Sequence, residues 1–85
     1  MRSDDQEARI RQILQQHGRL ESAVDTMDRD AELSAAGLTS HATVSVMLAL
    51  EEEFGIEFPD QMLTRGVFTS IASIRSAIET LAPAA

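Results

Sequence analysis

The stretch GLTSHATVSVMLALEEEFGIEFPD, residues 37–60, contains the strongest helix signal in the chain. We expect a helix that begins at Thr39 or Ser40, runs to about Phe54 and stops at Gly55, because glycine readily adopts the left-handed conformation that ends helices. The connector that follows is expected to be extended, since a residue before proline disfavours helical backbone. The apolar stripe predicted to face the core consists of Val44, Met47, Leu50 and Phe54, broadened by Val46.

An amphipathic helix is predicted before this stretch. Over residues 4–17, apolar side chains recur at helical spacing, and Gly18 ends the run. Between residues 18 and 38 the periodicity is lost, and we expect an ordered connection that crosses one end of a helical bundle. The apolar residues predicted to pin this connection to the core are Leu20, Val24, Met27 and Leu33.

After the connector, Pro59 is expected to start a short helical turn through Leu63, which Gly66 breaks. Thr69 or Ser70 then caps a last helix, and Pro83 closes the ordered part. The predicted buried face of this helix consists of Ile71, Ile74, Ala77, Ile78 and Leu81. The fold class is therefore all-α: a small four-helix bundle, with three main helices, one short third helix and a long first loop.

Composition limits what this chain does. Its 85 residues form one small domain, with a modest core and no room for a deep pocket beside it. No run approaches the roughly 18 apolar residues of a membrane-spanning helix, and the start resembles no signal peptide, so we expect a cytoplasmic protein. Cysteine is absent, which excludes disulfides, thiolate metal sites and a cysteine nucleophile. Any thiol chemistry needs a sulfur from outside.

The net charge of −7 arises in one segment. Residues 30–64 contain seven acidic residues and no lysine or arginine, whereas the charges of the remaining segments balance. Such a field repels nucleic acid and favours a partner with a basic patch. A solvated acidic face without a partner is the alternative.

Ser40 lies where a glycine-containing loop meets the strongest helix. The first turn of a helix has N–H groups without partners and carries partial positive charge. A phosphate on Ser40 would therefore be stabilised by its own helix. An ordinary N-cap serine explains the same spacing.

The segment that runs from Gly37-Leu38-Thr39-Ser40-His41 through Leu50-Glu51-Glu52-Glu53-Phe54 to Pro59-Asp60 resembles the second helix of acyl carrier proteins. Those proteins typically read Gly-x-Asp-Ser-Leu, then Leu-Glu-Glu-Glu-Phe, then Ile-Pro-Asp, and the spacing from serine to phenylalanine agrees without gaps. The resemblance extends more loosely over the full chain. It implies a single carrier-protein domain over residues 1–85, in which 4′-phosphopantetheine is attached to Ser40 and carries an acyl or aminoacyl group as a thioester.

The resemblance also implies a surface for partner enzymes. Leu48 lies off the predicted core stripe and matches a position that makes an apolar contact in the family, while Glu51 and Glu52 match residues that meet basic patches. The expected partners are a phosphopantetheinyl transferase and an acyl- or amino-acid-loading ligase or synthase. No nucleic acid and no membrane are expected, and the carrier is expected to be a monomer.

Three residues around the serine depart from the family pattern. Thr39 replaces the usual aspartate, His41 the usual leucine, and Ala42 an acid near the helix start. Thr39 and His41 therefore join the residues expected to contact partners, because the transferase and later enzymes read this neighbourhood. The run resembles specialised bacterial carriers, some of them similar to carriers charged with amino acids by dedicated ligases.

Other functions fit the sequence less well. Ser40 and His41 are adjacent, and adjacent side chains on a helix diverge, so no nucleophile–base pair and no catalytic residue is expected. The acidic loop at residues 25–32 fails the EF-hand pattern, and no metal site is predicted. An unmodified acidic helical adaptor that binds a basic protein partner is the alternative to a carrier.

Overall fold

The computed structural model describes residues 3–20, 24, 26–63 and 66–81, and these residues form helices and loops with no strand among them. Helix α1 spans Ser3–His17, α2 spans Ser40–Phe54, α3 spans Asp60–Leu63 and α4 spans Ile71–Leu81. A single 3₁₀ turn, Val67–Thr69, precedes α4. The predicted all-α fold, with three main helices, one short third helix and a long first loop, is confirmed.

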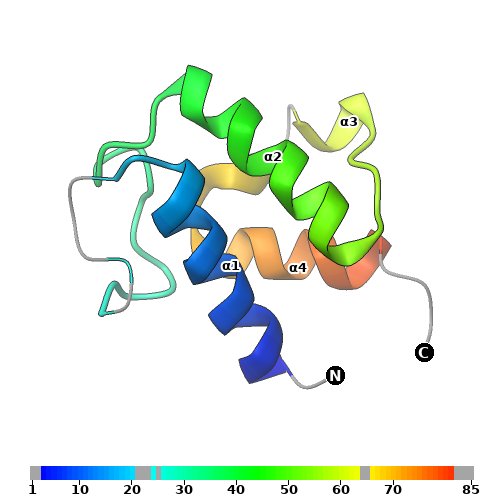
Figure 1. Ribbon diagram of the computed structural model, residues 1–85, viewed down its shortest axis with the longest axis horizontal. Coiled ribbons are helices and arrows are strands. Elements are labelled where there is room, and N and C mark those ends of the chain that lie inside the picture. The colour runs from blue at the N-terminus through cyan, green and yellow to red at the C-terminus, as the bar shows by residue number, and fades with distance from the viewer. Residues whose placement is uncertain (1–2, 21–23, 25, 64–65, 82–85) are drawn as a thin grey trace.

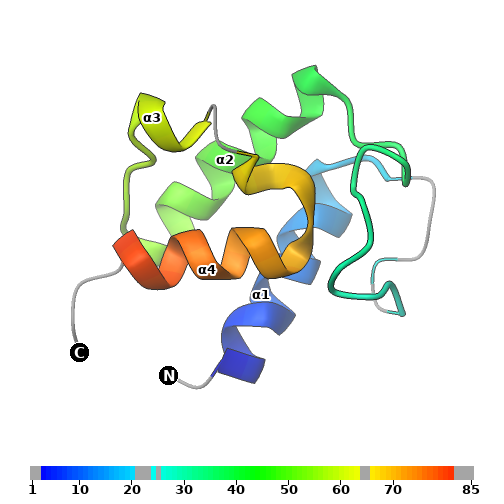
Figure 2. The same cartoon turned by 180° about the vertical axis from the view of Figure 1, so that it is seen from behind.

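Helix α1 packs against both α2 and α4. Helix α4 lies behind α1 and α2 in Figure 1 and in front of them in Figure 2. The short helix α3 lies beside the 3₁₀ turn, where the rings of Phe58 and Phe68 meet edge to face with centroids 5.4 Å apart. One long side of α2 therefore faces the core and the opposite side faces solvent.

Every long segment contributes to the core. The largest side chains that are fully buried come from α1, the long loop, α2 and α4: Ile10, Leu14, Val24, Leu33, Val46, Leu50, Ile71, Ile74 and Ile78. The predicted face of α4 is confirmed, with Leu81 partly buried at its end. Val24 and Leu33 pin the loop as predicted, and Leu20 and Met27 pack against the edge of the core.

The stripe predicted for α2 is wrong at Val44, which is 51% exposed. Met47 and Phe54 are only partly buried. The buried positions of the helix are Ala42, Val46 and Leu50. Because α2 carries apolar residues on more than one face, two stripes fit the spacing, and only packing into the shared core selects one of them.

The ends of the helices follow the prediction with one difference. Gly55 ends α2 at φ 64°, and its N–H group donates to the Glu51 carbonyl. Helix α1 ends at His17, but the left-handed residue is Arg19, at φ 53°, rather than Gly18. Gly18 is needed for another reason, since a Cβ atom there would lie 2.6 Å from the Leu14 carbonyl oxygen.

Helix α4 begins with a serine cap. The Ser70 hydroxyl accepts a hydrogen bond from the Ser73 N–H group at 3.1 Å, so Ser70 rather than Thr69 caps the helix. The Met62 N–H group donates to the Pro59 carbonyl at 2.9 Å, which confirms the short turn predicted there. Pro83 lies outside the described residues.

Arg11 holds the long loop against α1. Its Nη1 atom donates to the Val24 carbonyl at 2.7 Å and to the Met27 carbonyl at 2.6 Å. Further along, the Leu33 N–H group donates to the Thr69 carbonyl, and the Ala72 N–H group to the Arg29 carbonyl. Backbone groups of a loop without regular structure are thus satisfied by one side chain and by the start of α4.

We expect Arg11→Gln to lower the free energy of unfolding by about 1–3 kcal/mol, because it removes two hydrogen bonds from a charged donor to loop carbonyls. Urea unfolding followed by circular dichroism measures the change. Arg9→Gln is the matched control on the same helix, since Arg9 is 49% exposed and its ion pair with Glu53 contributes little. Equal stabilities of the two variants would contradict the anchoring role of Arg11.

Candidate functional site

The first turn of α2 is capped by Thr39. Its backbone is extended, at φ −90° and ψ 164°, and its hydroxyl accepts a hydrogen bond from the Ala42 N–H group at 3.0 Å. The Thr43 hydroxyl donates to the Thr39 carbonyl at 2.7 Å. The sequence predicted a helix start at Thr39 or Ser40, and the structure shows that Thr39 is the N-cap.

Ser40 is the first residue of α2 and is exposed. Its hydroxyl has no hydrogen-bond partner among the described residues. The interpretation of Ser40 as an ordinary N-cap is wrong, because Thr39 occupies that position. The hydroxyl is thus presented to solvent at the positive end of a fifteen-residue helix.

The electrostatics of this helix end suit an anion. Helix α2 has no acidic side chain in its first turn. Ala42, which stands where the resembling family usually has an acid, is buried and neutral. A phosphodiester on Ser40 would therefore meet the free N–H groups of the first turn without repulsion from that turn.

The outward face of α2, formed by His41, Val44, Leu48 and Glu52, is a continuous stripe at intervals of three and four residues. Its two large apolar side chains, Val44 and Leu48, are 51% and 55% exposed. Leu48 was predicted to be exposed and is. Sequence reasoning missed Val44, which the stripe pattern had assigned to the core.

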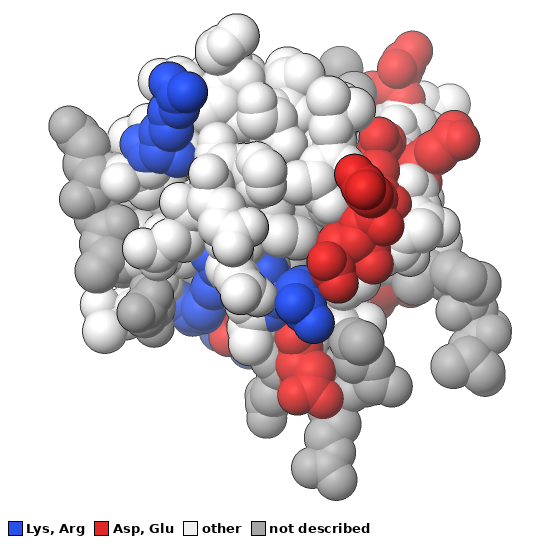
Figure 3. Space-filling model, viewed as in Figure 1, with Lys and Arg blue, Asp and Glu red and all other residues white. Residues whose placement is uncertain are grey.

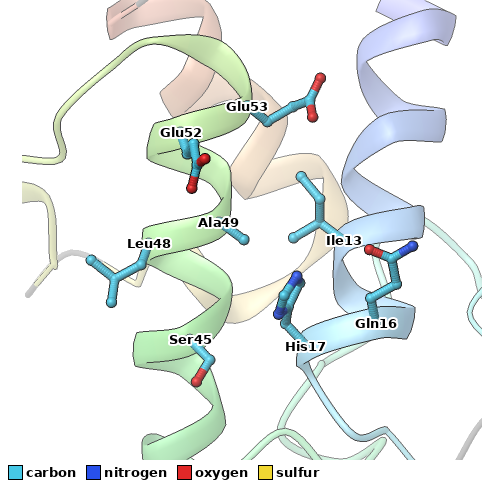
Figure 4. A pocket seen from close by; sticks show the side chains of 8 residues that line it. All are labelled: Ile13, Gln16, His17, Ser45, Leu48, Ala49, Glu52 and Glu53. Carbon is cyan, nitrogen blue, oxygen red and sulfur yellow. The ribbon is translucent and has the colours of Figure 1, made fainter.

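Glu51 and Glu52 differ in what their carboxylates do. One Glu51 oxygen accepts a hydrogen bond from the Phe58 N–H group at 2.8 Å and so holds the connector after α2. Glu52 is exposed, beside Leu48 in Figure 4. Both acids were predicted to meet basic patches of partner enzymes, but Glu51 also holds the connector through the Phe58 N–H group, which the sequence spacing did not reveal.

An open groove of about 640 Å³ runs between α1 and α2 beside the outward face. Figure 4 shows Ile13 and Ala49 between the two helices, with Leu48 turned away from α1. The groove is lined by Ile13, Gln16, His17, Ser45, Leu48, Ala49, Glu52 and Glu53. His17, predicted to lie at a helix boundary, is the exposed last residue of α1.

Acidic side chains gather on one side of the molecule. Figure 3 shows them on the right of the view, over the C-terminal half of α2 and toward α3. The exposed members there are Glu52, Glu53, Glu57 and Asp60. Near the end of α1 and the beginning of α2, the described residues in the same view show a basic side chain and no acidic one.

Two kinds of site are not found in the described parts of the chain. No group of three or more His, Asp or Glu side chains there is placed to hold a metal ion. No helix there is long and apolar enough to cross a membrane.

Comparison with known proteins identifies the family. Residues 8–81 match the family described as the phosphopantetheine attachment site. This chain belongs to that family. Its cofactor is 4′-phosphopantetheine, and the free hydroxyl of Ser40 at a helix N-terminus fits such an attachment chemically.

Two relatives are similar to this chain in sequence over most of their length. The aminoacyl carrier protein of Agrobacterium fabrum is 47% identical over 74 residues, which cover 87% of this chain and 89% of that protein. A solution structure from Agrobacterium tumefaciens is 47% identical and covers 87% of this chain and 89% of that one, with a TM-score of 0.71.

One similar structure is a complex. It contains an engineered Bradyrhizobium japonicum glycine:[carrier protein] ligase with a carrier protein from Agrobacterium tumefaciens and AMP. The matched chain is 48% identical, with a TM-score of 0.82, and the match covers 86% of this chain and 97% of that one.

We expect Thr39→Ala to destabilise the unmodified protein by about 1 kcal/mol, because it removes the cap of α2. Ser40→Ala is the matched control and should change the free energy of unfolding by a few tenths of a kcal/mol at most, since its hydroxyl bonds to no described residue. Urea unfolding of both variants measures the difference. A larger loss in Ser40→Ala than in Thr39→Ala would contradict this assignment of the cap.

Proposed function

We propose that this protein carries an amino acid as a thioester on a phosphopantetheine arm attached to Ser40. The observation that supports this best is the exposed Ser40 hydroxyl, which bonds to no described residue at the N-terminus of α2 because Thr39 caps the helix. The arm supplies the thiol that this cysteine-free chain lacks. The chain itself contributes an anchor, a favourable helix end and a surface that partners read.

The nature of the cargo is inferred from the relatives and the core. The similar protein of Agrobacterium fabrum is an aminoacyl carrier protein. The core here is filled by aliphatic side chains that are fully buried. An amino acid is too small and polar to gain from entering such a core, whereas a long acyl chain would need space within it. These observations favour an amino acid over a fatty acyl group.

The outward face of α2 is the proposed docking surface for a phosphopantetheinyl transferase and an amino acid:carrier protein ligase. Its apolar centre, Val44 and Leu48, is flanked by the exposed carboxylate of Glu52. A small apolar centre with charged surroundings suits brief encounters, in which charge raises the association rate more than the affinity. The complex of a similar carrier with a ligase supports a partner of this class.

Thr39 and His41 are proposed to set which enzymes accept Ser40. Thr39 uses its hydroxyl inside its own helix, so a partner meets its methyl group rather than the carboxylate of a typical carrier. His41 is exposed on the outward face. A transferase or ligase adapted to an aspartate and a leucine at these positions meets an uncharged threonine and a polar imidazole here.

The remaining expectations concern the protein as a whole. We propose that residues 1–85 form a single carrier domain that works as a non-catalytic monomer in the cytoplasm. The net charge of −7 supports a monomer, because two copies of the chain repel each other. It also supports the absence of nucleic acid among the partners, because the phosphates of a nucleic acid are negative as well.

The unmodified adaptor remains the second candidate because the acidic side of α2 serves either function. Intact mass separates the two after incubation with coenzyme A and a permissive phosphopantetheinyl transferase. We expect one phosphopantetheinyl group on the wild-type protein and none on Ser40→Ala. A wild-type mass that does not change, or a modified Ser40→Ala variant, would contradict the proposed attachment.

We further expect Leu48→Ala and Glu52→Lys to slow loading of the modified carrier by an amino acid:carrier protein ligase, by roughly threefold or more, while leaving the fold intact. Glu57→Lys is the matched control for Glu52→Lys, since it makes the same charge change at an exposed position in the connector. Initial rates of aminoacylation at limiting carrier concentration give the comparison. Equal slowing by both charge changes would indicate a general charge effect instead of a docking face.

A further inference from the structure

A second hollow lies at the Ser40 end of the molecule, between the end of α1 and the beginning of α2. Its volume is about 220 Å³, room for several water molecules of about 30 Å³ each and hence for a phosphate group. We call it the basic hollow, because three basic side chains and no carboxylate are found among the described residues that line it. Its lining residues are His17, Gly18, Arg19, Gly37, Thr39, His41, Ala42 and Ser45.

Arg19 is exceptional among the arginines that the structure describes. The other four each form an ion pair with a glutamate: Arg9 with Glu53, Arg11 and Arg29 with Glu7, and Arg75 with Glu79. Arg19 has neither an ion pair nor a hydrogen bond to a described residue, although the chain has twice as many acidic residues as arginines. The side chains of His17 and His41 are likewise without partners within the described ranges.

The backbone at the end of α1 brings Arg19 to this place. A Cβ atom built on Gly18 would lie 2.6 Å from the Leu14 carbonyl oxygen, so there is no space for a side chain at this position. Arg19 then takes a left-handed conformation at φ 53°, which is unfavourable for a residue with a Cβ atom. The chain thus turns tightly after α1, and an arginine occupies the strained position beside the first turn of α2.

The charge distribution favours an anion in the basic hollow. The acidic side chains of α2 and the connector lie toward the other end of α2 (Figure 3). The positive end of α2 adds to the field of Arg19, and the two imidazoles offer N–H donors. Thr39 and His41, which flank Ser40 in the chain, both line the hollow, whereas the Ser40 side chain does not, so a phosphate on Ser40 would reach the hollow from its rim.

We propose that the basic hollow is a seat for the phosphodiester of the arm, with Arg19 as its main donor and His17 and His41 beside it. This inference rests on the proposed attachment at Ser40. The phosphodiester is the charged group of the arm and the part nearest to the serine, whereas the rest of the arm, with its hydroxyl, amides and thiol, is uncharged. The positive charge of Arg19 disfavours the ammonium group of an aminoacyl cargo. The root of the arm is therefore held against the protein, and the loaded end is kept away from this hollow.

The test uses the intact protein before and after modification. Intact mass first establishes whether Ser40 carries the arm. Two-dimensional ¹H–¹⁵N spectra then follow the Nε–H group of each arginine. We expect the Arg19 signal to shift on modification and the Arg9 signal to stay in place, because Arg9 lies on α1, outside the lining of the hollow, and pairs with Glu53. The phosphorus resonance of the arm should move in Arg19→Gln and remain unchanged in Arg9→Gln.

A thermal measurement checks the same coupling without relying on spectra. Modification should raise the melting temperature of the wild type and of Arg9→Gln by the same amount, and that of Arg19→Gln by less, since a seated phosphate binds the folded state. A protein that takes up no arm would overturn the proposed function itself. A modified protein in which Arg19 does not shift, and whose melting response is the same in all three forms, would overturn the seat alone.

Discussion

The hydrogen bond between the Thr39 hydroxyl and the Ala42 N–H group is the interaction on which the functional end of this molecule depends. A helix that begins with Thr-Ser offers two hydroxyls and needs one cap. By taking that role, Thr39 leaves the next hydroxyl, that of Ser40, free and exposed at the positive end of α2. In typical carriers an aspartate stands at this position. Here a neutral threonine performs the capping, and the first turn is left without an acidic side chain.

Around that end, the protein separates its charges by position. Glu51 binds the connector through the Phe58 N–H group, Glu53 pairs with Arg9, and Glu52 remains exposed on the outward face of α2. Three adjacent glutamates thus have three different surroundings. Near Ser40 the opposite sign prevails, because Arg19 lines the basic hollow and pairs with none of the described acidic residues. An arm with one phosphate near its root and a reactive group at its tip suits a surface divided in this way.

The long first loop shows how a small domain orders a segment without regular structure. Val24 and Leu33 enter the core, while Arg11 and the start of α4 satisfy backbone groups of the loop. Because every long segment contributes to one core, α2 is held by several neighbours at once. A partner can therefore press on its outward face without needing to rearrange the rest of the molecule.

The sequence by itself determined the helices, their ends to within a residue or two, the apolar anchors of the loop and the family, because helical periodicity, glycine stops and the motif spacing are local properties. It did not decide which stripe of α2 is buried, since apolar side chains lie on more than one face and only packing into the shared core selects Val46 over Val44. The divergent surroundings of the glutamates and the gathering of His17, Arg19 and His41 also required the tertiary structure. These arrangements depend on residues far apart in the chain, whose side chains meet only when the helices pack.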